Sequence, residues 1–219
     1  MKRVAVALSS LALAAVSQNA ASASVPRALA KQCKAELRQF GNVRKEAWKP
    51  AFSALAKHAE VRARAGIALP TEATMVLVYM AAGHHTSVRL SYVATLTATG
   101  DWHVDFVGED GPGVLSIPIE TRAPRSWFLS AGNSALLSHL LENPCLHAEP
   151  PSNYSRTVPA RGAVDHVLDI VTPNWSRTHY SLDAMPGLNG EILALITYEP
   201  RFPDGLPLRI GPLDYSIPR

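Results

Sequence analysis

The sequence of 219 residues is poor in cysteine and in charge, with two cysteines and 18% Asp, Glu, Lys and Arg. It contains no Cys-x-x-Cys, HExxH or HxH motif, so the usual spacings of zinc ligands are absent. A glycine-rich phosphate loop and a GxSxG nucleophile elbow are also missing. No apolar run reaches the roughly 20 residues that a membrane-spanning helix requires. These absences remove the common signatures of zinc enzymes, nucleotide-binding proteins, serine hydrolases and helical membrane proteins, and no cofactor is expected.

The first 23 residues have the pattern of a secretory signal peptide. Lys2 and Arg3 precede a mainly apolar run over 4–16, and Ala21 and Ala23 are the small residues that a signal peptidase reads. Without this segment, 19 basic residues face 18 acidic ones, and the formal net charge falls from +3 to +1. A charge this small gives no reason to expect nucleic-acid binding. We expect a periplasmic or secreted protein, and the Ala-rich leader favours a bacterial host.

The two cysteines allow two interpretations. Export places them in an oxidising compartment, where Cys33 and Cys145 are expected to form a structural disulfide. That bridge would close a loop of about 112 residues and stabilise the fold by roughly 4–5 kcal/mol. The alternative is a nucleophilic Cys145 with His147 as its base, which requires a reduced and activated thiolate. No other feature marks a nucleophile, so the sequence favours the disulfide.

The spacing of apolar residues predicts an α+β fold with N-terminal helices packed on a mainly antiparallel sheet built from hairpins. The expected helices cover 25–40, 50–64, 131–142 and 190–198, and the last two are short and Leu-rich. The expected strands cover 74–80, 87–98, 102–107, 113–119, 164–171 and 177–182. We expect one domain over 24–198, with a Pro-rich loop over 148–162 inside it. A Pro-rich extended tail would follow over 199–219.

The hairpin over 87–107 is the clearest element. Apolar residues alternate with polar ones from Val88 to Leu96, and Trp102, Val104 and Phe106 continue the alternation after the Gly100 turn. We expect these apolar side chains on the inner face of the sheet. Trp48, Phe52, Leu55 and Ala59 are expected to form the apolar face of the second helix. Ser130 and Asn189 are the expected N-terminal caps of the last two helices.

Four residues form the one candidate site for catalysis or metal binding. His84 and His85 lie in a predicted turn, and His103 and Asp105 share the polar face of one strand. A His–carboxylate pair could serve a metal or an acid–base reaction, but a solvated strand face has the same composition. The convergence of these side chains in one pocket would distinguish the two interpretations.

Charge is divided unevenly along the chain. Residues 24–64 carry ten basic and three acidic residues, whereas 65–219 carry nine and fifteen. The basic helices could meet an anionic surface or an acidic protein partner, or they could pack on the acidic sheet of the same chain. The sequence therefore favours an exported, non-enzymatic binding or structural protein of the bacterial envelope. The alternative is an exported enzyme or metal-binding protein that uses His84, His85, His103 and Asp105.

Overall fold

The structure is a computed structural model. It describes residues 27–38, 48–71, 73–83, 86–112, 119–150, 152–153, 164–182 and 184–198. The predicted signal peptide over 1–23, most of the strand over 113–119 and the tail over 199–219 lie outside the described residues. His84 and His85 also lie outside them, as does most of the loop over 148–162.

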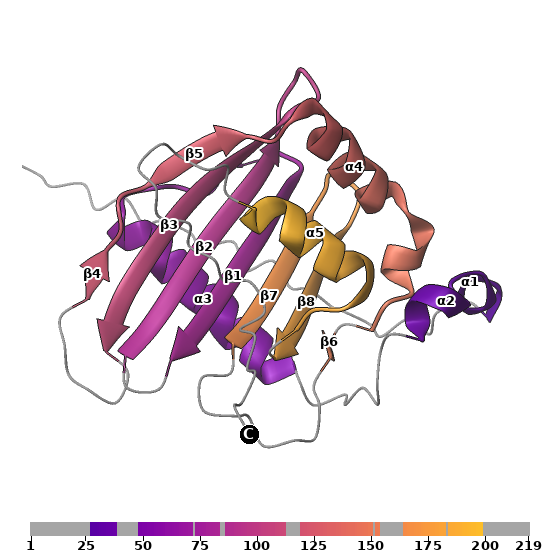
Figure 1. The fold of residues 1–219 in the computed structure, drawn as a ribbon, viewed down its shortest axis with the longest axis horizontal. Coiled ribbons are helices and arrows are strands. Elements are labelled where there is room, and N and C mark those ends of the chain that lie inside the picture. The colour runs from indigo at the N-terminus through magenta and orange to yellow at the C-terminus, as the bar shows by residue number, and fades with distance from the viewer. Residues whose placement is uncertain are drawn as a thin grey trace, which may run out of the picture.

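One sheet organises the fold (Figure 1). Its strands are β1 (Met75–Gly83), β2 (Thr86–Leu96), β3 (Trp102–Pro112), β4 (Glu120–Thr121), β5 (Arg125–Phe128), β6 (Ser152–Asn153), β7 (Val164–Val171) and β8 (Ser176–Leu182). They lie in the order β4-β3-β2-β1-β7-β8-β6, and β5 pairs with β3. Every pairing is antiparallel except the short one between β6 and β8. With the helices, this sheet confirms the α+β class.

Helices lie on both faces of the sheet. They are α3 (Trp48–Arg64), α4 (Ala131–Glu142) and α5 (Gly187–Thr197), with the 3-10 turn η2 at Pro144–His147. The segment predicted as one helix over 25–40 forms two short helices, α1 (Arg27–Gln32) and α2 (Lys34–Leu37), which lie to the side of the sheet in Figure 1. Figure 1 shows α4 and α5 over one face and α3 across the opposite face. None of the helices in the described ranges is long and apolar enough to cross a membrane.

The main core lies between the sheet and the pair α4 and α5. The alternation predicted for the first hairpin is confirmed, because Leu90, Tyr92 and Ala94 join this core. The predicted inward residues of β3 are also buried in it: Trp102, Val104 and Phe106. The second predicted hairpin is present as β7 and β8, with Thr172 Oγ1 accepting a hydrogen bond from Trp175 N at 3.0 Å in its turn.

The helix α3 is rotated relative to the predicted apolar face. The buried positions in its described part are Ala54, His58, Val61 and Arg62. Of the predicted face, Leu55 is half-buried and packs against the same cluster, whereas Ala59 is exposed, and the side chains of Trp48 and Phe52 lie outside the described residues. Polar residues turn inward here because the sheet offers them hydrogen-bonding partners, which a pattern of apolar residues does not reveal.

The last helix also begins differently from the prediction. It starts at Gly187, so Asn189 lies in its first turn and is not its cap. The cap is supplied from elsewhere in the chain by Glu149, as described below. By contrast, the predicted cap of α4 is confirmed, with Ser130 Oγ accepting from Asn133 N at 3.2 Å.

Candidate functional site

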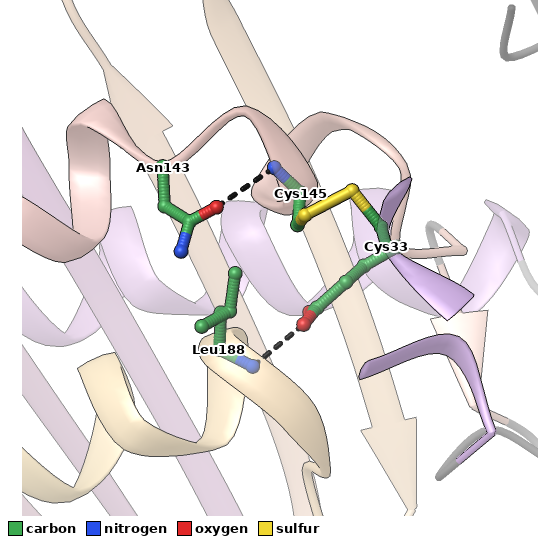
Figure 2. The surroundings of a disulfide bond; sticks show 5 residues. Cys33, Asn143, Cys145 and Leu188 are labelled. Carbon is green, nitrogen blue, oxygen red and sulfur yellow. Dashed lines mark hydrogen bonds between the residues drawn. A yellow bond between two sulfur atoms is a disulfide. The ribbon is translucent and has the colours of Figure 1, made fainter. Parts of the chain in front are cut away.

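Cys33 and Cys145 form a disulfide, as the sequence predicts, with an S–S distance of 2.05 Å and 5.3 Å between their Cα atoms. Both residues are buried in the main core. Asn143 Oδ1 accepts a hydrogen bond from Cys145 N at 2.9 Å and shapes the turn that presents this cysteine (Figure 2). The paired sulfurs leave no thiolate for the alternative Cys145–His147 nucleophile, and His147 packs edge-on against Trp175 instead.

A hollow of about 440 Å³ lies beside the disulfide. Its lining consists of Gln32, His139, Glu142, Asn143, Pro144 and Cys145. Gln32, His139 and Glu142 are exposed, so the hollow has no buried charged group that could hold a ligand. It does not make a convincing active site.

His103 and Asp105 come together on the sheet face that α3 partly covers. Their nearest atoms, Nδ1 and Oδ2, are 3.8 Å apart, and the side chains are 30% and 35% exposed. The ring of His103 also packs against Phe128, 4.9 Å between centroids, on the neighbouring strand β5. Among the described residues no group of three or more His, Cys, Asp or Glu could hold a metal ion.

The strand register separates His103 from the chain positions beside His84 and His85. His103 pairs with Thr95, whereas Ser87 pairs with Gly83 near the other end of β2. Eight residues of strand, at about 3.3 Å each, put roughly 26 Å between Thr95 and Ser87. The register therefore gives no support to a site that joins all four predicted residues.

A buried polar cluster that the sequence pattern did not reveal lies between α3 and the sheet. Ser91 Oγ on β2 lies 3.0 Å from His58 Nε2 on α3, and both residues are buried. Burial, and then the nearby Arg62, lower the pKa of His58 to about 4, while a backbone hydrogen bond with Tyr92 acts in the opposite direction. His58 is thus neutral at pH 7, and its Nε2 accepts the hydroxyl proton of Ser91.

The Ser91–His58 contact has the distance of a nucleophile–base pair, but its surroundings differ from those of a catalytic dyad. No carboxylate among the described residues orients the His58 ring. The neighbour of Ser91 is Arg62, whose Nη1 donates to Ser91 Oγ at 3.3 Å. A substrate cannot reach either atom while α3 covers them, so this cluster is better understood as part of the α3–sheet interface.

An ion pair closes the same interface at the end of α3. Arg64 donates from Nε and Nη2 to the two carboxylate oxygens of Glu109 on β3, at 2.5 and 2.8 Å. Glu109 is buried, and Arg89 Nη1 lies 3.9 Å from its Oε2. The hydrogen bond with Glu109 raises the pKa of Arg64 above the ordinary value of an arginine. This part of the basic segment 24–64 therefore packs on an acidic residue of the same chain, as one of the two charge interpretations expects.

The backbone explains why α3 ends where this pair forms. Gly66 adopts a φ of 70°, which favours glycine. Its N–H donates to Ala63 O at 3.1 Å, and Ile67 N donates to Arg62 O at 3.0 Å. These two bonds form a Schellman motif, so the last turn, with Arg62 and Arg64, is held in a defined position over the sheet.

A second buried polar cluster joins η2 to α5 on the opposite face. The carboxylate of Glu149 accepts from Leu188 N at 2.6 Å, from Asn189 N at 3.2 Å and from the Asn189 side-chain amide. The same amide nitrogen lies 3.1 Å from His179 Nδ1. Burial raises the pKa of Glu149 and lowers that of His179 to about 3. The cluster caps α5 and is fully enclosed, so its role is to join elements of the fold.

The exposed side of α1 and α2 carries a row of basic residues. Arg27, Lys31, Lys34 and Arg38 are all exposed. Two backbone hydrogen bonds join the two helices into one segment: Cys33 N–H donates to Leu29 O, and Leu37 N–H donates to Cys33 O. The spacing of four residues places Arg27 and Lys31 on one side of α1, and Lys34 and Arg38 follow at α2 after the interruption of the helix at Cys33. The disulfide lies on the opposite side, with Leu29 and Leu37 packed against the main core.

One signal for the α3 cluster was present in the sequence, since His58 and Arg62 are spaced by one helical turn and share a stripe with Ala54 and Val61. Nothing in the spacing shows that this stripe meets Ser91, because that contact spans 33 residues of chain.

No family model, no curated protein and no solved structure matches this chain, so any functional conclusion depends on its own residues.

Proposed function

We propose that the chain is an exported, soluble, non-enzymatic protein that binds an anionic membrane surface in a bacterial envelope. It would be periplasmic or secreted, released by removal of residues 1–23, and its N-terminal helical segment would stay packed against the domain through the Cys33–Cys145 disulfide. The exposed basic row on α1 and α2 carries this proposal.

The described side chains next to the row are small. Arg27 lies at the start of α1, and Arg38 follows directly after the end of α2. Ala28 and Ala35 beside the row are exposed and small. The segment therefore presents cations without bulky apolar side chains, as expected for contact with lipid headgroups and not for insertion into the acyl region.

The charges of the row are free to act outside the molecule. No ion pair within the described part of the chain involves Arg27, Lys31, Lys34 or Arg38. Each basic residue near an anionic leaflet contributes about 1 kcal/mol, so four contribute about 4 kcal/mol, or roughly a thousandfold partitioning. Binding of this kind is reversible and is screened by salt.

The test uses protein recovered from the periplasm of an expression host and vesicles of phosphatidylcholine with or without phosphatidylglycerol. We expect sedimentation with the anionic vesicles at low salt, about tenfold or more weaker binding at 0.5 M NaCl, and loss of binding in Lys31→Glu/Lys34→Glu. Lys57→Glu, an exposed change on α3, is the matched control and should reduce binding less. Absence of binding to anionic vesicles at low salt would exclude the proposal, and an N-terminus other than Ser24 would correct the cleavage site.

The alternative of an exported enzyme or metal-binding protein rests on the contact between His103 and Asp105. Two ligands from one strand are too few for a stable site, and the strand register gives no support to a third ligand from His84 or His85. Elemental analysis of the untagged, dialysed protein decides this: stoichiometric zinc or copper that is lost in His103→Ala would favour the alternative.

A further inference from the structure

The interface between α3 and the sheet is more polar than the main core. Where the side chains of α3 are described, Ala54 and Val61 are its buried apolar residues, and His58 and Arg62 are buried beside them. Their apolar partners on the sheet are Tyr79, Val107, Val167 and Tyr180. The main core, on the face that carries α4 and α5, includes none of the described side chains of α3 (Figure 1). The sheet can therefore lose its contact with α3 and still keep that core.

Two basic side chains of α3 lie together in this interface. His58 Nε2 lies 3.0 Å from Ser91 Oγ, and Arg62 Nη1 donates to the same oxygen at 3.3 Å. Protonation of His58 would place a second positive charge beside the guanidinium of Arg62, out of contact with solvent. Burial and like-charge repulsion both disfavour that charge while α3 stays on the sheet.

The groups that face this pair from β1, β2 and β3 do not neutralise a second charge. The Tyr79 ring lies edge-on to His58, 6.2 Å between centroids, and burial raises its pKa to about 12, so it is uncharged at pH 7. Arg89 on β2 is a further cation. Asp105 on β3 acts on Arg62 electrostatically, but its close partner is His103, 3.8 Å away.

The other described carboxylates around α3 already have partners. Those on the sheet accept hydrogen bonds from other side chains: Glu109 from Arg64, Asp165 from Tyr180 and Asp169 from Thr178. Glu60 on α3 is exposed and lies 3.8 Å from Arg64. A protonated His58 would thus have no unengaged carboxylate beside it in the described part of the interface.

We infer that protonation of His58 detaches α3 from the sheet while the sheet, α4 and α5 keep their structure. The helix is an acid-sensitive cover, and its removal exposes the apolar residues of the sheet beneath it. Gly66 follows α3, and no helix or strand is described between it and Met75, so α3 can move without displacing β1. This device is separate from the basic row on α1 and α2 and does not depend on the proposed membrane binding.

Acid favours the detached state because that state takes up the proton more readily. With α3 in place, burial and then Arg62 lower the pKa of His58 to about 4, whereas an exposed histidine has its ordinary pKa of 6.5. Between pH 7.5 and pH 5 the ratio of detached to attached molecules should therefore rise roughly thirtyfold. This range lies above the ordinary pKa of a carboxyl group.

The first test is hydrogen exchange of the unaltered chain at pH 7.5 and pH 5, with each rate divided by that of the unfolded peptide at the same pH. Peptides from α3 should exchange roughly thirtyfold faster at pH 5, because a detached helix of 17 residues is only marginally stable in water. At pH 5 they should also exchange about tenfold or more faster than peptides from α4 and α5. No rise for α3 would overturn the inference. Equal exchange of the three helices would also overturn it, because α3 would then leave only when the whole chain unfolds.

The second test assigns the effect to His58. His58→Gln keeps a polar side chain beside Ser91 but cannot take up a proton, so the rise in exchange between the two pH values should disappear. His139→Gln, at an exposed position of α4, is the matched control and should retain the rise. An undiminished rise in His58→Gln would contradict the inference. The first test uses only the unaltered chain, so it decides the matter even if His58→Gln does not fold.

Discussion

Ser91 Oγ and His58 Nε2 lie 3.0 Å apart beneath α3, and neither residue is accessible to solvent. The imidazole is neutral at pH 7, because burial lowers the pKa of His58 to about 4. The α3–sheet interface is therefore sensitive to acid at this position.

We predict that acid destabilises the fold through His58. The unfolded residue takes up a proton near pH 6.5, whereas the folded residue does so only near pH 4. Between these values the unfolded state binds more protons, so stability falls as the pH falls, by about 3 kcal/mol for this residue. Urea unfolding from pH 7.5 to 4.5 measures the loss. Its control is His58→Gln, which should lose about 3 kcal/mol less over the same range; equal losses in both proteins would contradict the prediction.

We predict that loss of the disulfide destabilises the chain by about 4–5 kcal/mol. The bridge between Cys33 and Cys145 spans 112 residues, and its main effect is to restrict the unfolded chain. The double variant Cys33→Ala/Cys145→Ala should show this loss in urea unfolding, and a reductant should have no further effect on it. A difference below about 1 kcal/mol between the oxidised protein and the double variant would show that the bridge contributes little.

We predict that Glu149→Ala destabilises the fold by about 2–4 kcal/mol. The change removes the acceptor of Leu188 N and Asn189 N, and the buried start of α5 then lacks a cap. Glu142→Ala is a suitable control, because Glu142 lies at the exposed end of α4 and should change stability by less than about 0.5 kcal/mol. Similar values for the two variants, measured by chemical denaturation, would argue against a capping role for Glu149.

Two glycine substitutions should have opposite effects. A Cβ on Gly190 would lie 1.9 Å from Met185 O, so Gly190→Ala must displace the backbone before α5, at a cost of about 1–3 kcal/mol or more. A Cβ on Gly132 in α4 meets no atom within 4 Å, and Gly132→Ala should stabilise the helix by up to about 1 kcal/mol. Thermal unfolding of both variants checks the pair, and an unchanged Tm for Gly190→Ala would show that Met185 moves without cost.

The sequence alone determined the elements whose signals are local. Alternation along Leu90, Tyr92 and Ala94 identified the inner face of the first hairpin, because side chains on a strand point to opposite faces in turn. A hydroxyl before an apolar run identified Ser130 as the cap of α4, and the two cysteines could pair only with each other. Each of these predictions needs only a few neighbouring residues or the cysteine count.

Only the tertiary structure decided which polar side chains are buried and what they contact. The contacts of Ser91 with His58 and of Glu149 with Leu188 span 33 and 39 residues, so no local spacing records them. The rotation of α3 followed from these partners and not from its own apolar pattern. The burial of Arg62 Nε and Nη2 without an acceptor among the described residues became visible for the same reason, because it can be recognised only when the three-dimensional surroundings of the group are known.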